Sequence, residues 1–176
     1  CIVVGVWNTG ANRHPDYFPQ KPFLSLSKQQ QDSIYIATRG ADHALFPVPV
    51  QSDAYLKFLV TELKPFIDST FSVATDRANT FIAGSSMGGL ISMYAICEYP
   101  TVFGAAACLS THWPGIFTVD NNPIPAAFIN YLKLHLPDPT THRIYFDYGT
   151  STLDSLYKPF QLQADKVMKK KGYGKH

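Results

Sequence analysis

The sequence has no long hydrophobic run, almost no charge imbalance and few cysteines. No stretch approaches the ~18 consecutive apolar residues that a membrane-spanning helix needs, so no membrane span is predicted. The 15 lysines and arginines exceed the 13 aspartates and glutamates by only two. The basic residues near the C-terminus are not interleaved with aromatic residues, as they are in nucleic-acid-binding surfaces, so a nucleic-acid partner is not expected.

The sequence also lacks the motifs of common metal and nucleotide sites. Its three cysteines, Cys1, Cys97 and Cys108, form no C-x-x-C pair, and no H-E-x-x-H zinc motif is present. A G-x-x-x-x-G-K-[ST] phosphate-binding loop is missing as well. We therefore expect no cofactor and no metal. The cysteines do not define a cellular compartment.

What the chain does contain is the composition of a globular protein, with 45% hydrophobic and 16% charged residues. Its 176 residues have the size of one domain, so residues 1–176 are predicted to form a single domain. Short apolar runs alternate with segments of helical periodicity. Strands are expected at 1–7, 79–83, 104–109 and 143–148, and helices at 52–66, 87–98, 125–136 and 154–170.

Helices between successive strands require crossover connections, which give a mostly parallel sheet with helices on both faces. The predicted fold class is therefore α/β. The segments 8–33 and 39–50, rich in proline and aromatic residues, are expected to be loops, with a short extra strand at 33–38. Ser52 is expected to cap the helix that follows it, and Pro65 to kink or tighten that helix.

A G-x-S-x-G motif occupies residues 84–88, between a predicted strand and a predicted helix. The motif places a serine hydroxyl on a sharp turn, and the residues two before and two after it lack side chains that would collide. Ser86 is therefore the candidate nucleophile, and the backbone N–H of Met87 is the expected donor to the oxyanion of the reaction. Ser85 is a weaker candidate because Ala83 and Met87 flank it at the positions that need glycine.

A serine nucleophile needs a histidine base and an acid that orients the histidine. Two aspartates lie at the end of the strand expected at 143–148: Asp147 within the strand pattern and Asp154 in the loop beyond it. Asp154 is preferred as the acid, although a helix cap would also explain it, and Asp147 is the alternative. Of the six histidines only His176 follows Asp154, and it is the last residue, with no further strand to return it to the motif.

Three residues are assigned to the substrate pocket: Trp7, His112 and Trp113. His112 and Trp113 follow the strand expected at 104–109, so they should reach the edge of the sheet that carries Ser86. The other histidines are expected on loops or helix surfaces; they are His14, His43, His135 and His142.

Three stretches resemble the putative-esterase (esterase D-like, enterobactin-esterase-like) branch of the α/β-hydrolase superfamily. They read FLVTELKPFID at 58–68, TFIAGSSMGG at 80–89 and YPTVFG at 99–104. The branch includes siderophore, feruloyl and acetylxylan esterases and the antigen 85 mycolyltransferases. The resemblance implies an α/β-hydrolase fold with Ser86 as nucleophile and Asp154 as acid.

Two features of that branch have no counterpart in the sequence. One is a set of N-terminal strands with a His-Gly loop that supplies a second oxyanion N–H, and the other is a catalytic histidine beyond a further C-terminal strand. We therefore expect the chain to be a portion of a longer α/β-hydrolase domain. The expected function is hydrolysis of small carboxylic esters through an acyl-enzyme on Ser86. The alternatives are an acyltransferase that uses the same motif and a non-catalytic ligand-binding domain on a hydrolase scaffold.

Overall fold

A three-stranded parallel sheet lies at the centre of the computed structural model, which describes residues 1–40 and 43–174. In sheet order its strands are β3 (Phe81–Ser85), β4 (Ala105–Leu109) and β5 (Arg143–Phe146). Ala83 pairs with Ala107, and Ala107 pairs with Tyr145. Because the strands are parallel, their carboxyl ends meet at one edge, and the residues that follow each strand are brought together there.

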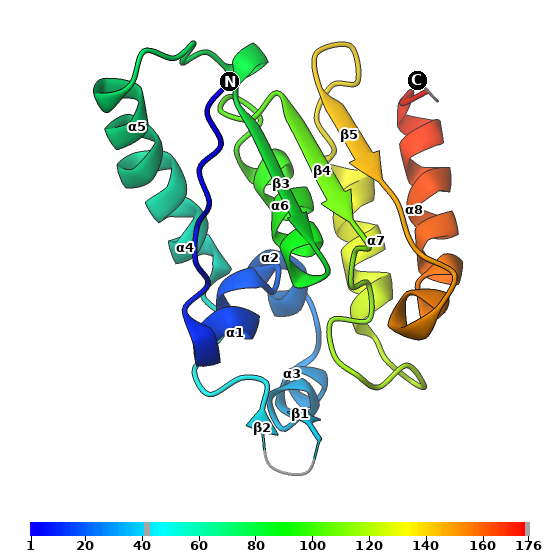
Figure 1. Cartoon of the computed structure of the whole chain (residues 1–176). Coiled ribbons are helices and arrows are strands. Elements are labelled where there is room, and N and C mark those ends of the chain that lie inside the picture. Colours follow the sequence, from blue (N-terminus) through cyan, green and yellow to red (C-terminus); the bar gives the residue numbers. More distant parts are fainter. Residues whose placement is uncertain (41–42, 175–176) are drawn as a thin grey trace.

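Each strand is followed by a helix that packs on the same face of the sheet (Figure 1). These helices are α6 (Met87–Glu98), α7 (Ile124–His135) and, after a 3₁₀ turn η4 (Thr152–Leu156), α8 (Lys158–Lys171). Ten of the 12 residues of α6 are buried, so this helix is apolar on all sides. A Cβ atom on Gly89 would lie 2.8 Å from Thr111 Oγ1, so glycine allows α6 to begin close to the end of β4. The predicted strands and helices between residues 79 and 170 are confirmed.

The opposite face of the sheet is open in the part of the chain that the structure describes. Phe81 and Tyr145 point toward this face, with 64% and 57% of their surface exposed. Ala106 points toward the helices and is buried. The predicted α/β fold with a parallel sheet is therefore confirmed, and the described helices that follow its strands lie on one face of that sheet.

A long helix precedes β3, as predicted for residues 52–66. It consists of α4 (Ser52–Phe58), a π-helical turn η2 (Leu59–Leu63) and α5 (Lys64–Thr70). Pro65 cannot donate a hydrogen bond to the carbonyl of Thr61, and its ring would clash with that carbonyl in a regular α-helix. The wider π turn before Pro65 accommodates this defect, and the helix continues to Thr70. Ser52 is the first helical residue rather than the cap, and its hydroxyl oxygen accepts a hydrogen bond from the Gln20 N–H at 3.0 Å.

The segment expected to be a loop, 8–33, folds into short helices instead. They are η1 (Gly10–Asn12), α1 (Arg13–Tyr17), α2 (Gln20–Leu24) and α3 (Lys28–Tyr35). Pro15 and Pro22 each lie in the first turn of a helix, where a missing N–H costs little because such groups have no partner within the helix. A capping box between Ser27 and Gln30 starts α3, which occupies half of the predicted strand 33–38. The prediction of that strand is therefore wrong. A short antiparallel pair follows it in the described residues, β1 (Thr38–Arg39) with β2 (His43–Ala44).

Aromatic packing fixes these short helices against the rest of the molecule. The ring of Phe18, at the end of α1, lies 5.3 Å from the rings of Phe46 and Phe128, measured between centroids. The side-chain amide of Gln51 also donates to Asp16 Oδ1 at 2.8 Å. These contacts hold Arg13 and His14, the first two residues of α1, near Ser86 at the carboxyl edge of the sheet.

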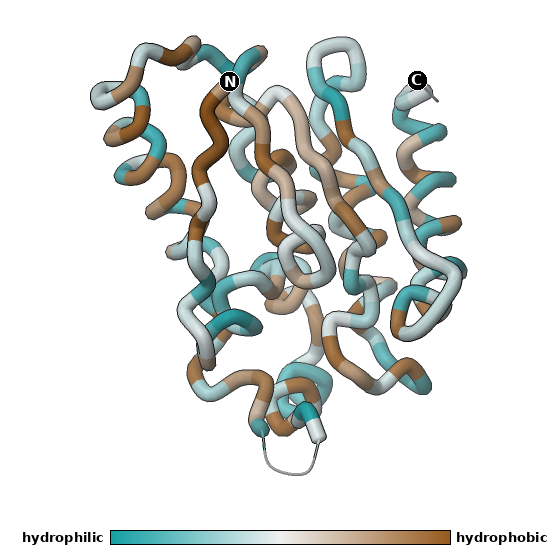
Figure 2. Tube along the Cα trace, viewed as in Figure 1, coloured by the Kyte–Doolittle hydropathy of each residue, from teal (hydrophilic) through white to brown (hydrophobic). Residues whose placement is uncertain are grey.

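Residues 1–7 are extended but form no strand within the described ranges. They make no backbone hydrogen bond there, and Trp7 is 92% exposed. The prediction of a strand buried on both faces is therefore wrong for this structure, because a β-branched run is buried only when neighbouring strands pair with it. Figure 2 shows this segment as a hydrophobic stretch of the backbone trace. No helix of the described residues is long and apolar enough to cross a membrane.

Candidate active site

Ser86 occupies the turn between β3 and α6 with a strained backbone, at φ 60° and ψ −118°. For a residue with a side chain this conformation costs on the order of 1–3 kcal/mol and is typical of functional turns. The N–H of Ser86 donates to the Leu109 carbonyl at 2.9 Å, which holds the turn against the end of β4. The structure therefore displays the hydroxyl at the carboxyl edge of the sheet.

The two flanking glycines have different reasons to be glycine. A Cβ atom on Gly84 would lie 2.6 Å from the Gly88 carbonyl oxygen, a distance that real side chains do not adopt. A Cβ atom on Gly88 would meet nothing within 4 Å. The predicted steric requirement therefore holds at Gly84 and is wrong at Gly88, because the backbone of the new helix approaches Gly84 and leaves the space beside Gly88 open.

Met87 is the first residue of α6, and its backbone lies beside the Ser86 side chain. N–H groups in the first turn of a helix have no acceptor within the helix, and the helix dipole adds partial positive charge at this end. The Met87 N–H can therefore donate a hydrogen bond to an oxyanion that develops on a substrate bound at Ser86. The side chain of Met87 is buried and closes the floor of the site.

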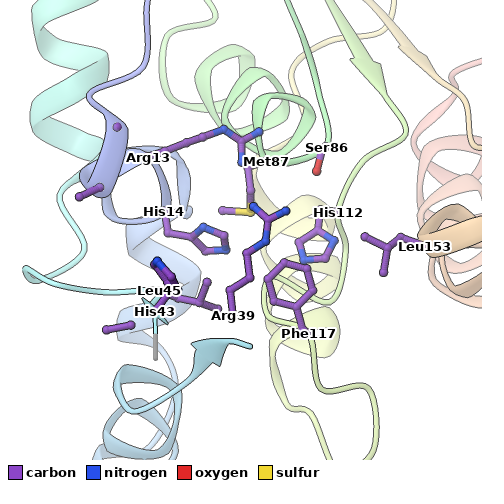
Figure 3. Close-up of a pocket in the computed structure, with 13 residues that line it drawn as sticks. Arg13, His14, Arg39, His43, Leu45, Ser86, Met87, His112, Phe117 and Leu153 are labelled. Atoms are coloured by element: carbon purple, nitrogen blue, oxygen red, sulfur yellow. The ribbon is translucent and has the colours of Figure 1, made fainter. Parts of the chain in front are cut away.

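Ser86 lines a cavity of about 470 Å³ (Figure 3). Its wall includes Met87, the start of α1, the β1–β2 pair and the loop after β4. His112 is on this wall, and its backbone N–H donates to the Ser86 carbonyl at 3.2 Å. His14 and His43 are on the wall as well.

The His112 ring is buried beside Ser86 and is held by a tyrosine. Its Nδ1 lies 2.7 Å from the Tyr157 hydroxyl, and its Nε2 has no hydrogen-bond partner within the described residues. Burial, and then the positive charge of Arg13, lowers the pKa of His112 to about 4. The ring is therefore neutral at pH 7.

Burial and the negative charge of Asp154 raise the pKa of Tyr157 to about 12, while its contact with the Ser86 side chain acts in the opposite direction. The Tyr157 hydroxyl therefore keeps its proton at neutral pH. The Tyr157 hydroxyl thus lies between the His112 ring and the Ser86 side chain and contacts both. Sequence reasoning missed Tyr157, because its place depends on how α8 packs.

Both candidate acids lie near the end of β4 and bind the same residue, Ser110. The Ser110 hydroxyl donates to Asp154 Oδ2 at 2.7 Å, and the Ser110 N–H donates to Asp147 Oδ1 at 2.7 Å. The Gly149 N–H also donates to Asp154 Oδ2, at 3.0 Å. Ser151, rather than Asp154, is the cap of η4, so a helix cap does not explain Asp154.

The two tryptophans lie outside the cavity wall. Trp7 is exposed on the extended N-terminal segment. Trp113 is fully buried on the helix side of the sheet, where its indole N–H donates to Gln161 Oε1 at 2.9 Å and its ring lies 5.7 Å from that of Phe146. The expectation that they line the pocket is therefore corrected: Trp113 turns toward α8 rather than toward Ser86. His176 lies outside the described residues.

His14 and His43 are the two histidines of the cavity wall that were expected on a loop or helix surface, and His14 is the less exposed of the two. It lies in α1, and its buried Nε2 also lacks a hydrogen-bond partner in residues 1–40 and 43–174. Burial, and then the nearby His112 and Arg13, lowers the pKa of His14 to about 4. No local signal marks this residue, because the chain that separates it from Ser86 exceeds seventy residues and only the tertiary fold joins them.

A serine on a strained strand-to-helix turn, at the carboxyl edge of a parallel sheet, defines the α/β-hydrolase class. The model of the family described as "Putative esterase" matches residues 27–166, and the chain belongs to this family. It is 30% identical over 97 residues to the uncharacterized protein YbbA of Bacillus subtilis (strain 168), a match that covers 54% of this chain and 34% of YbbA.

Two solved structures are similar to the chain to different degrees. One is a ferulic acid esterase, with a TM-score of 0.54 and 22% identity over 68% of this chain and 49% of that one. The other is an enterochelin esterase from Shigella flexneri, with a TM-score of 0.40 and 17% identity over 69% of this chain and 38% of that one. The chain thus spans about a third of the curated relative and at most half of these structures. The first structure supports the α/β-hydrolase fold.

Proposed function

We propose that this chain carries the nucleophile of a serine esterase that cleaves small carboxylic esters. The observation that carries the proposal is the Ser86 turn: the residue has φ 60°, faces a cavity and immediately precedes the first helical N–H groups of α6. This combination holds a hydroxyl where a carbonyl carbon can reach it and supplies donors for the oxyanion that forms. Membership of the family supports ester hydrolysis in general.

In the proposed reaction, Ser86 Oγ attacks the ester carbonyl carbon while its proton passes to a general base. The Met87 N–H stabilises the tetrahedral oxyanion, a contribution of about 3–4 kcal/mol for one such donor in comparable enzymes. The bond to the alcohol oxygen then breaks, the alcohol leaves with a proton, and an acyl-enzyme remains on Ser86. Attack by water releases the carboxylic acid and restores the hydroxyl.

The acid of the catalytic group is proposed to be Asp154, with Asp147 as the alternative. Two donors, Ser110 and Gly149, fix Asp154 Oδ2, whereas Asp154 Oδ1 makes no hydrogen bond to any described residue. A carboxylate held in this way can accept an imidazole N–H through its second oxygen, as the acid of a Ser-His-Asp triad does. His112 fits the base less well, because Tyr157 already binds its Nδ1.

Ester turnover by the intact protein tests this proposal. With p-nitrophenyl acetate as substrate, we expect Ser86→Ala to remove at least 99.9% of kcat, an approximate loss based on serine enzymes that lose their nucleophile. Ser85→Ala is the matched control, because it removes a neighbouring hydroxyl on β3, and it should retain activity. Equal turnover by wild type and Ser86→Ala would contradict the proposal.

A further inference from the structure

The cavity beside Ser86 has a cationic wall. Arg13, at the start of α1, and Arg39, on β1, both line the cavity, and no aspartate or glutamate does so within the described residues. Figure 3 shows the guanidinium group of Arg39 between His14 and His112, and that of Arg13 near Met87, on the Ser86 side of the same cavity. Two positive charges therefore face the same space as the proposed nucleophile.

Neither arginine is neutralised by an ion pair in the part of the chain that the structure describes. The ion pairs there are formed by lysines: Lys21 with Glu98, Lys28 with Asp32 and Lys64 with Asp68. The guanidinium of Arg13 lies 5.7 Å from the centroid of the Tyr17 ring, and that of Arg39 lies 5.8 Å from the centroid of the Phe117 ring. Such contacts orient an arginine without cancelling its charge.

Two histidines of the wall provide a second, independent observation. The Nε2 atoms of His14 and His112 are buried and have no partner among the described residues, and a buried polar atom without a partner is destabilising. Burial together with the arginine charges keeps the pKa of both rings at about 4, so both are neutral and each can present one N–H. If the Tyr157 hydroxyl donates to Nδ1 of His112, the proton of that ring lies on Nε2. An acceptor in the cavity would satisfy these atoms.

We propose that this cavity binds an oxyanionic group of the ester substrate, a carboxylate or a phosphate, between Arg13 and Arg39. This inference rests on the proposed function, because it makes the cavity part of the Ser86 site. The planar guanidinium groups match the paired oxygens of such anions, and each neutral ring of His14 and His112 carries one N–H that can add an uncharged donor. The substrates selected are therefore acidic esters rather than neutral ones.

Binding is tested first without catalysis, by calorimetric titration of glutarate and of inorganic phosphate into the intact Ser86→Ala protein. We expect saturable binding that weakens as ionic strength rises, and a loss of affinity of about tenfold or more in Arg13→Gln and in Arg39→Gln. The control variant, Arg143→Gln, removes the same charge at the start of β5, the opposite end of the sheet from Ser86. It should bind as the parent does. Absence of binding, or equal loss in Arg143→Gln, would overturn the inference.

Turnover of a matched pair of esters then tests selectivity: p-nitrophenyl butyrate and the p-nitrophenyl monoester of glutaric acid, which differ chiefly by a terminal carboxylate. The wild type should prefer the acidic ester in kcat/KM by about tenfold or more, and the preference should be lost in the variant that combines Arg13→Gln with Arg39→Gln. Turnover that depends on Ser86 but shows no preference would overturn this inference and leave the proposed function intact. Absence of turnover that depends on Ser86, together with glutarate binding, would overturn the proposed function instead.

Discussion

The hydroxyl of Ser110 donates to Asp154 Oδ2 at 2.7 Å, across the ends of two different strands. Ser110 adopts φ 42° at the end of β4, and its N–H donates to Asp147. This strained serine therefore orients both carboxylates that are candidates for the catalytic acid. The relationship makes Ser110 a positioning residue whose role can be measured.

Replacement of Ser110 by alanine should lower kcat about tenfold, because Asp154 loses one of its two donors, while KM stays near the wild-type value. Steady-state kinetics on p-nitrophenyl acetate measures both constants. The control variant is Ser110→Gly, which also removes the hydroxyl but relieves the positive φ. If Ser110→Gly keeps full kcat, the Ser110 hydroxyl is not required to position Asp154.

The choice between the two acids is decided by asparagine variants. Asp154→Asn should reduce kcat by about 10³-fold or more, because an amide cannot stabilise the charged imidazole that forms during the reaction. Asp147→Asn keeps the shape of an acceptor for the Ser110 N–H and should cost much less. Kinetics of both variants at the same pH makes the comparison. A larger loss of kcat in Asp147→Asn than in Asp154→Asn would identify Asp147 as the catalytic acid.

A pair of glycine variants tests the geometry of the turn. Gly84→Ala should lower the free energy of unfolding by about 1–3 kcal/mol, because the new methyl would meet the Gly88 carbonyl oxygen at 2.6 Å. Gly88→Ala introduces its methyl into open space and should not destabilise the protein. Denaturant unfolding followed by circular dichroism gives both values. Equal destabilisation by the two substitutions would contradict the close contact between Gly84 and the Gly88 carbonyl oxygen.

Burial of His112 predicts a pH dependence of stability. In the unfolded chain a histidine binds a proton near pH 6.5, whereas the folded protein keeps the pKa of His112 at about 4. The unfolded state therefore binds more protons between pH 6.5 and pH 4, so the contribution of this ring to stability falls as the pH falls through that range. The loss is about 3 kcal/mol for a shift of this size.

Unfolding by urea at several pH values measures this slope in the wild type and in His112→Gln. The variant should be less stable at pH 7 but should show a smaller decline between pH 6.5 and pH 4. Parallel declines would contradict the burial of a neutral His112.

Trp113 was expected to line the pocket, and its observed place predicts a different phenotype. Trp113→Phe removes the indole donor to Gln161 and should lower the free energy of unfolding by about 1–3 kcal/mol, because a buried acceptor loses its partner. The KM for p-nitrophenyl butyrate should not change. A raised KM with an unchanged free energy of unfolding would indicate that Trp113 lines the substrate pocket after all.

The sequence predicted the parts of the fold whose signals are local. The helix at 87–98 has the predicted ends, because the glycines and serines before Met87 and the Tyr99-Pro100 pair beyond Glu98 mark both of its limits. The helices between residues 10 and 35 were missed, because their prolines suggested a loop although they lie in first turns. The exposed segment 1–7 was misjudged, since its β-branched pattern indicates burial only when partner strands are present.

In the site, the Ser86 motif could be read from five consecutive residues, 84–88, but the residues around it could not be predicted. Arg13, His14 and Arg39 reach the cavity through the packing of α1 and the β1–β2 pair, which involves contacts between residues far apart in the chain. Arginines and histidines in such segments carry no mark that separates them from ordinary surface residues. Only the folded arrangement shows that they face one cavity.

The most direct test of the account is the site at which a fluorophosphonate bonds to the intact protein. After labelling at neutral pH, digestion and mass spectrometry should find the adduct on the peptide that contains Ser86, and fragmentation should place it on Ser86 rather than on Ser85. Ser86→Ala should prevent the labelling, and Ser85→Ala should not. Labelling at another residue, or labelling that persists in Ser86→Ala, would contradict the assignment of Ser86 as nucleophile.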